Sequence, residues 1–211
     1  MTLIRMGVVT GGHSFDVIHF HHLLRDLEGV DSYVQHLEDF AAAPEADRDS
    51  YDVLLFYTMP RETPMGKPEV ALSHLGSTTQ GIVVMHHALL AHPGWPTWDE
   101  ITGICGRDLE RYSHDEQMPM VVADPQHPVT QGLSDWTMID ETYVMPDARA
   151  ANGNHILLTT RHVDCMKTIA WTRHYRQSCV FCLQSGHDNQ TWADVSFRQL
   201  LRQGILWSAG R

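Results

Sequence analysis

The stretch CVFCLQSGHD, residues 179–188, sets the expected fold of this 211-residue chain. It begins with a short apolar run, which is typical of a buried β-strand, and an amphipathic segment from Trp192 to Ala209 with helical spacing follows it. Open α/β sheets place their chemistry at strand-to-helix turns of this kind. We therefore expect His187 and Asp188 to lie at the mouth of a site.

Three apolar runs upstream extend the same pattern. Residues 3–9 end in a glycine turn before a helical stripe, and residues 81–85, GIVVM, run directly into His86 and His87. Residues 52–57 are apolar enough to be buried on both faces, as the strands of a parallel sheet are. We predict a single domain, residues 1–211, with a doubly wound and mostly parallel sheet.

Shorter runs suggest an addition to this core. The segments 119–123 and 136–139 read as strands, and the residues between 106 and 117 read as a polar connection. Residues 155–160 and 168–171 resemble a hairpin pair. We expect them to form a small antiparallel extension.

Composition excludes several classes of partner. The formal charge is −11, and an acidic surface attracts neither nucleic acid nor an anionic membrane. No stretch of 18 or more apolar residues is present, and no signal-peptide pattern follows Met1. We expect a soluble, cytoplasmic protein, and the sequence leaves open whether it is a homo-oligomer.

The four cysteines do not suggest a disulfide framework, because they are few and scattered in a chain of this length. Cys179 and Cys182 have a metal-like spacing, but residues three apart in a strand point to opposite faces. We interpret them as ordinary reduced cysteines. The unusual feature is instead the 15 histidines, since histidine is the commonest metal ligand and a frequent acid or base.

Position separates the informative histidines from the others. One set of residues stands at strand ends or in the turns after them, and the carboxyl ends of parallel strands share one edge of a sheet. These residues are His13, His86 with His87, Glu141, His162, and His187 with Asp188. Three imidazoles and a carboxylate would suit a divalent metal such as Zn or Mn. A histidine and a carboxylate without metal could equally move a proton beside a carbonyl, and the spacing leaves both readings open.

Five motifs, in order along the chain, resemble the ThuA-like (trehalose utilisation) family, whose fold is related to that of class I glutamine amidotransferases. The motifs are Gly11-Gly12-His13 with Phe15-Asp16, His86-His87-Ala88-Leu89 before Trp95-Pro96, His127-Pro128-Val129 with Gly132-Leu133, Asp140-Glu141-x-Tyr143, and Gly186-His187-Asp188 with Phe197-Arg198 and Gly204-Ile205-Leu206-Trp207. The resemblance implies a flavodoxin-like three-layer α/β/α sandwich with a mainly parallel central sheet. It also implies a role in sugar catabolism, with a keto-sugar or 3-keto-glycoside as the substrate class.

We therefore predict a metal-assisted enzyme that isomerises a keto-sugar, or abstracts a proton beside its carbonyl with loss of a substituent, as an isomerase, lyase or hydrolase would. The predicted metal ligands are His13, His86, Glu141 and His187, for Zn or Mn and without a nucleotide cofactor. The predicted catalytic residues are His87, Glu141, His162 and Asp188. The predicted substrate contacts are Tyr57, Trp95 and Tyr143.

A second hypothesis is a carbohydrate-binding or regulatory domain that kept an amidotransferase-like fold without catalysis. The turn after residues 81–85 is where amidotransferases carry a nucleophilic cysteine. Here that turn holds His86 and His87, with neither a thiol nor a hydroxyl. An active glutamine amidotransferase is therefore not expected.

Overall fold

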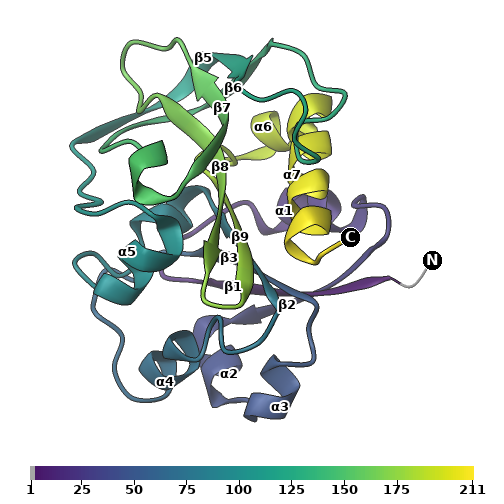
Figure 1. Cartoon of the computed structure of the whole chain (residues 1–211), viewed down its shortest axis with the longest axis vertical. Helices are drawn as coiled ribbons and strands as arrows, with labels where there is room; N and C mark the ends of the chain where they lie inside the picture. The colour runs from purple at the N-terminus through teal and green to yellow at the C-terminus, as the bar shows by residue number, and fades with distance from the viewer. Residues whose placement is uncertain (1–2) are drawn as a thin grey trace.

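Nine strands form one sheet in the part of the chain that the structure, a computed structural model, describes, residues 3–211 (Figure 1). Their order across the sheet is β2-β1-β3-β4-β9-β8-β7-β5-β6. The strands are β1 Ile4–Gly11, β2 Val30–His36, β3 Val53–Thr58, β4 Gly81–Met85, β5 Arg111–Val122, β6 Trp136–Val144, β7 His155–Thr160, β8 Thr168–Tyr175 and β9 Ser178–Leu183.

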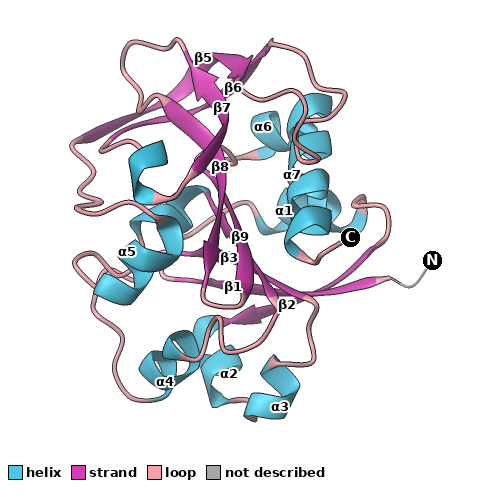
Figure 2. Ribbon diagram, in the orientation of Figure 1, coloured by secondary structure: helices cyan, strands magenta, loops and turns pink. Residues whose placement is uncertain are grey.

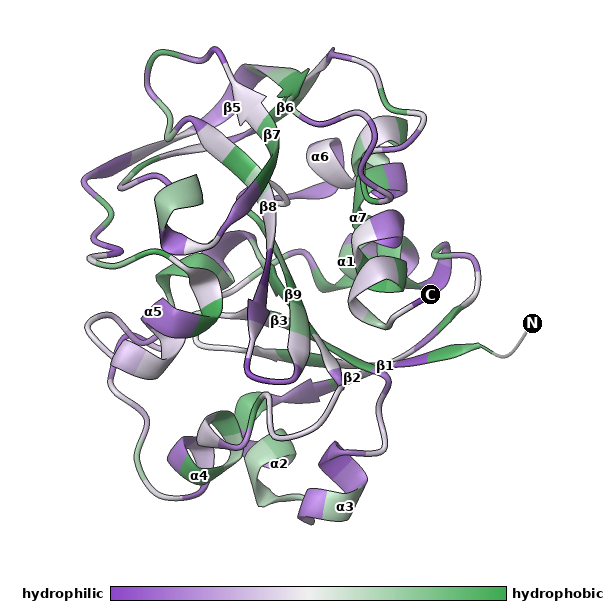
Figure 3. Cartoon of the chain, viewed as in Figure 1, coloured by the Kyte–Doolittle hydropathy of each residue, from purple (hydrophilic) through white to green (hydrophobic). Residues whose placement is uncertain are grey.

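The parallel half of the sheet consists of β2, β1, β3, β4 and β9. Every residue of β3 and β4 is buried, which explains why both strands read as continuous apolar runs. Figure 3 shows green, apolar stretches along β1 and β9 in the same half of the sheet. The strands predicted at 52–57 and 81–85 are confirmed, with the first displaced by one residue.

The other half of the sheet is antiparallel and larger than expected. The pairs β9–β8, β8–β7, β7–β5 and β5–β6 are all antiparallel. Half of the neighbouring pairs are therefore antiparallel, and the prediction of a mainly parallel sheet is wrong. The physical reason is that a two-residue turn joins β8 to β9, so these strands pair antiparallel and the strands beyond β8 continue this half of the sheet. β5 is also longer than predicted, since it begins at Arg111, eight residues before the predicted strand. Its first half is largely exposed and polar, so no apolar run marks it.

Helices lie on both sides of the sheet, with α1, α6 and α7 together on one side and α2, α4 and α5 on the other (Figure 2). The helices are α1 Val17–Arg25, α2 Leu37–Ala42, α3 Glu45–Arg48, α4 Lys67–Ser73, α5 Pro96–Thr102, α6 Asn189–Ala193 and α7 Val195–Ser208. Short 3₁₀ turns span His86–Leu90 and Ala150–Asn152. The single helix predicted from Trp192 is divided at Asp194, whose side chain accepts a hydrogen bond from the Phe197 amide and begins α7.

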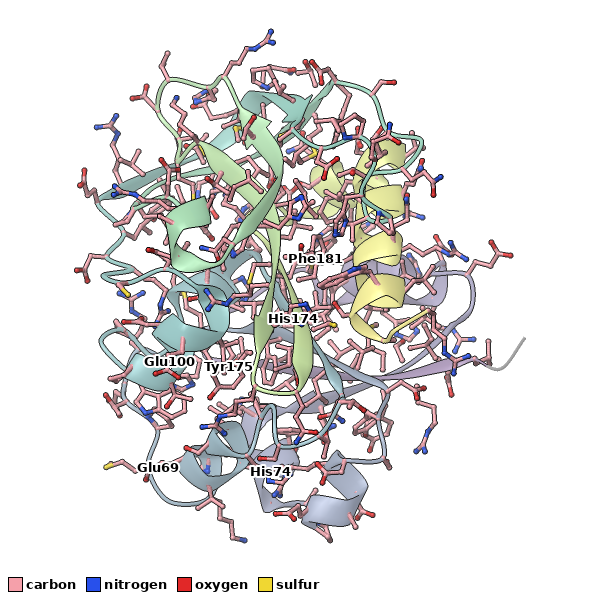
Figure 4. The ribbon with its side chains drawn as sticks, in the orientation of Figure 1. Glu69, His74, Glu100, His174, Tyr175 and Phe181 are labelled. Atoms are coloured by element: carbon pink, nitrogen blue, oxygen red, sulfur yellow. The ribbon has the colours of Figure 1, made fainter. Side chains whose placement is uncertain are left out.

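A glycine lets α7 approach β9 closely. A Cβ atom at Gly204 would lie 2.2 Å from the Phe181 ring, and Figure 4 shows Phe181 pointing from β9 toward α7. This packing seals the core beneath the strand that leads to His187. It also explains why glycine, a poor helix former, stands inside a helix.

The cysteines are free, as expected. The Cys182 sulfur is buried 3.9 Å from the Thr102 carbonyl oxygen, while the Cys179 sulfur lies 3.8 Å from His174 Nδ1. The two thiols therefore have separate surroundings and do not form a metal or redox pair. Among residues 3–211, none of the helices has both the length and the apolar character that a membrane crossing demands.

Candidate functional site

Three side chains from distant parts of the chain converge at the carboxyl edge of the parallel strands. His86 Nε2 lies 3.0 Å from Glu141 Oε2, and His187 Nδ1 lies 3.2 Å from the same oxygen. The two histidine nitrogens are 3.3 Å apart. His86 follows β4, His187 follows β9, and Glu141 comes from β6. The sheet thus brings together three residues that the sequence had placed in one site.

The backbone conformation of the turn after β4, called the elbow below, sets the direction of the His86 side chain. His86 has φ of 56°, in the left-handed region that non-glycine residues seldom adopt, and such outliers cluster at functional sites. Its Nδ1 donates to the Gln184 carbonyl oxygen at 2.9 Å. This bond fixes the ring with its other nitrogen, Nε2, toward Glu141.

Gly186 shapes the opposing turn. Its φ is 129°, a conformation that glycine reaches without strain. A Cβ atom there would lie 3.3 Å from the Met85 side chain and 3.5 Å from His86 Cβ. The glycine therefore lets the turn of His187 pass directly beside the elbow.

Asp140 holds that turn against β6. Its Oδ1 accepts hydrogen bonds from the backbone N–H groups of Glu141 at 2.8 Å and His187 at 3.1 Å, and from the Thr191 hydroxyl at 2.9 Å. Its Oδ2 accepts from the Gly186 N–H at 3.0 Å. A single buried carboxylate thus fixes Glu141 relative to His187, although Asp140 is not among the residues predicted for the site.

The electrostatics of the cluster favour a charged Glu141. Burial alone would raise the pKa of the Glu141 carboxyl, but hydrogen bonds with His187 and His86 outweigh burial and lower it well below its usual range. The hydrogen bond to Glu141 raises the pKa of His187. Burial raises the pKa of Tyr143 well above 10, so its hydroxyl, 3.0 Å from His86 Nε2, stays protonated.

His87 has a different environment from its neighbour. Its side chain is 2% exposed, and burial lowers the pKa of the ring to about 2. The ring packs on Tyr57 and His13, with centroids 4.1 Å and 4.8 Å away. His87 is therefore a neutral wall of the site at physiological pH.

Two adjoining cavities open over the cluster, with volumes of about 410 and 330 Å³. The larger is lined by His13, Met59, Arg61, His87, Leu90, Leu109, Tyr112, His114, Glu141, Tyr143 and His187. The smaller is lined by His13, Ser14, Phe15, Asp16, Tyr57, His87, His187 and Asp188. Three histidines, His13, His87 and His187, line both cavities.

Most of the predicted site residues lie around these cavities, but their positions differ from those expected. His13 lines both cavities but is not part of the cluster of His86, Glu141 and His187. Asp188 lines the smaller one, and its side chain accepts a hydrogen bond from the Gln190 N–H to begin α6. Tyr57 is almost fully buried, and its hydroxyl donates to the carbonyl oxygens of Gly186 and His187.

Besides His86, which is buried, two predicted residues lie outside the lining of both cavities. The His162 Nε2 lies 3.5 Å from Glu116 Oε2, on the antiparallel half of the sheet. Trp95 is 8% exposed and packs against His92. Both residues were predicted because they lie in turns, and a turn does not by itself reveal the edge of the sheet on which it lies.

Sequence reasoning also missed residues of β5. His114 Nδ1 lies 3.4 Å from Glu141 Oε1, and its ring centroid is 4.6 Å from that of His187. Tyr112 lines the same cavity. The alternation of Tyr112 and His114 with polar residues is a weak strand signal, and the polar composition of the segment favours a connection instead.

The trio fits a divalent metal ion. Because Nδ1 of His86 donates to a carbonyl oxygen, Nε2 of a neutral ring carries a lone pair, and it faces a carboxylate oxygen 3.0 Å away. Two acceptors at that distance require a proton or a cation between them. Zinc holds nitrogen and oxygen donors at about 2.0–2.2 Å, so two donors on one ion lie roughly 3.0–3.6 Å apart. The spacings of His86, Glu141 and His187 match that range.

The mixed sheet, with a turn after β4 that carries His86 and His87, is a fold shared with glutamine amidotransferase-like proteins. The chain belongs to the ThuA family, described as trehalose utilisation, whose family model matches residues 16–208. This membership associates the chain with sugar catabolism.

Solved structures agree on the fold. A protein from Parabacteroides merdae described as ThuA-like superposes with a TM-score of 0.78 at 19% identity, covering 99% of this chain and 90% of that one. A second, from Bacteroides uniformis, gives 0.73 at 19% identity, covering 97% and 91%. A protein from Thermoplasma acidophilum described as part of a GMP synthase gives 0.60 at 15% identity, covering 100% and 96%. A comparison with curated protein sequences finds no match.

Proposed function

We propose that this protein is a metal-dependent enzyme of sugar catabolism that moves a proton next to the carbonyl of a keto-sugar or 3-keto-glycoside, either to isomerise it or to eliminate a substituent. The observation that carries the proposal is that His86 Nε2, His187 Nδ1 and Glu141 Oε2 lie within 3.3 Å of one another, an arrangement suited to three ligands of one ion. Family membership in trehalose utilisation supports the substrate class.

The residues of the chain divide into three roles. His86, Glu141 and His187 would hold the ion, which when bound supplies a Lewis acid for a carbonyl and its neighbouring hydroxyl. Gln184 and Asp140 orient these ligands, as hydrogen-bonded partners of metal ligands do. Tyr143, kept protonated by burial, lines the larger cavity with its hydroxyl 3.0 Å from His86 Nε2.

The proton is carried by a residue that is not a ligand. His87 is a weak base, since burial lowers its pKa to about 2. His13 is exposed and lines both cavities, so it can reach both substrate and water. We assign proton abstraction to His13, which returns the proton to the adjacent carbon in an isomerisation or to the leaving group in an elimination.

The first test is metal content. Purified protein, dialysed against Zn²⁺ or Mn²⁺, should hold one ion per chain by elemental analysis, and Glu141→Gln should lose it. The chain offers a matched control in Glu45, Asp49 and His74, a partly exposed cluster that could also hold an ion. Glu45→Gln should keep the metal. Loss of the ion in Glu45→Gln with retention in Glu141→Gln would refute the assignment.

The second test is chemistry. Incubation with a 3-keto-glucoside in D₂O should incorporate deuterium beside the carbonyl, and His13→Gln should abolish incorporation while leaving metal content unchanged.

The absence of a nucleophile at the elbow favours a second candidate, a binding or regulatory domain for carbohydrates. That candidate predicts saturable sugar binding without deuterium incorporation or product.

A further inference from the structure

The strand β5 contains a bulge directly above the candidate site. Its pairing with β6 shifts register between Ser113 and Glu116. Asp115, within the shift, has φ of 58°, in the left-handed region. Bulges of this kind re-aim side chains and are over-represented beside active sites.

Contacts on both sides hold the bulge in place. The Ser113 hydroxyl donates to Glu116 Oε1 at 2.6 Å across it. The side-chain amide of Gln190 donates to the Asp115 carboxylate. Gln190 belongs to α6, which begins immediately after the turn of His187. The bulge is therefore tied to the same turn that carries one of the proposed metal ligands.

Two solvent-exposed ring side chains next to the bulge, Tyr112 and His114, line the larger cavity. Tyr112 is 57% exposed, and the His114 side chain is 50% exposed. The two rings lie edge to face with centroids 5.2 Å apart. By contrast, Tyr143, which lines the same cavity, is 2% exposed. Among the described residues that line this cavity, Tyr112 is the tyrosine whose ring is open to a ligand.

We propose that Tyr112 and His114 form the wall that binds the substrate's sugar ring, with Tyr112 packing against the ring and His114 hydrogen-bonding its hydroxyls. This inference rests on the proposed carbohydrate substrate. A pyranose ring has a face of C–H groups that packs on an aromatic ring as other apolar surfaces do. His114 already reaches the carboxylate of Glu141, so a hydroxyl bound to His114 lies next to the reacting centre. The antiparallel half of the sheet thereby determines which sugar is accepted.

The test measures binding rather than turnover. Methyl α-D-glucopyranoside and trehalose, which carry no ketone, serve as probes in saturation-transfer NMR titrations. Tyr112→Ala should weaken binding by roughly tenfold, the size of one lost aromatic contact. Tyr112→Phe keeps the ring and should bind within about twofold of the unchanged protein. Tyr33→Ala is the matched control, since Tyr33 is 62% exposed on β2 at the opposite end of the sheet.

A second pair of variants tests the bulge itself. Asp115→Asn keeps a residue that tolerates a positive φ and an oxygen that accepts from Gln190, so it should bind the probes normally. Deletion of Asp115 removes the extra residue, places His114 directly opposite Glu141 in a regular ladder and loses the contact with Gln190. Tyr112 and His114 are then re-aimed, and binding should weaken as in Tyr112→Ala. Folding of both variants is checked by circular dichroism, and the Tyr112 series stands if the deletion does not fold.

The outcomes separate this inference from the proposed function. Weakened binding in Tyr112→Ala supports the wall even when no deuterium is incorporated into a keto-sugar, which would refute only the chemistry. If Tyr112→Ala binds the probes as the unchanged protein does, or if Tyr33→Ala loses as much affinity, Tyr112 does not form the wall that binds the sugar ring. This conclusion holds whether or not the protein turns over a keto-sugar. No binding of either probe by the unchanged protein overturns the wall and removes support for the carbohydrate substrate.

Discussion

Replacing Asp140 by asparagine should destabilise the fold and weaken the proposed metal site. The asparagine oxygen can take the place of Oδ1 and keep its three hydrogen bonds. Its amide group then faces the N–H of Gly186 in place of Oδ2. One buried donor is left without an acceptor, which costs about 1–3 kcal/mol, and the other bonds lose the charge that strengthened them. We expect the free energy of unfolding to fall by about 3 kcal/mol in total, or roughly 6–12 °C in melting temperature for a chain of this size.

Urea unfolding followed by tryptophan fluorescence measures this change. Asp135→Asn is the matched control, because exposed Asp135 accepts one backbone hydrogen bond, from the Val122 N–H, and should change the free energy of unfolding by less than about 1 kcal/mol. Metal affinity, measured by calorimetry, should fall in Asp140→Asn and not in the control. If Asp140→Asn unfolds within about 0.5 kcal/mol of the unchanged protein, Asp140 does not anchor the His187 turn as we reason.

Two further predictions concern the cluster and the core. The lowered pKa of Glu141 contributes stability above its ordinary value of 4.5 that is lost as pH falls, and the raised pKa of His187 contributes stability below 6.5 that is lost as pH rises. In urea titrations of the metal-free protein, Glu141 and His187 together should therefore contribute most to the free energy of unfolding between pH 4.5 and 6.5. His187→Gln should remove the decline of that free energy above pH 6.5. A decline that stays the same in His187→Gln would show that His187 is not its cause. Gly204→Ala should lower the free energy of unfolding by about 2 kcal/mol, because the clash with Phe181 exceeds the gain of about 1 kcal/mol in helix propensity. A more stable Gly204→Ala variant would show that α7 can move away from β9.

The parallel half of the sheet and the turn after β4 could be predicted from the sequence. The strands at 52–57, 81–85 and 179–183 could be read because burial on both faces requires unbroken apolar runs. The absence of a nucleophile after β4 was equally visible. His86, Glu141 and His187 could be expected at one edge, since the carboxyl ends of parallel strands meet there.

The rest of the site depends on contacts between segments that are distant in the sequence. Glu141 lies within β6, an antiparallel strand, and reaches the edge through register rather than through a strand end. The roles of Asp140 and His114 depend on hydrogen bonds and a bulge that join segments far apart in the chain, and local spacing carries no trace of them. His162 was predicted at the site but lies elsewhere, because the sequence of a turn does not show where in the fold that turn lies. The sequence could name the chemistry of the site because residue types and strand ends are local properties, whereas its geometry is set by long-range pairing.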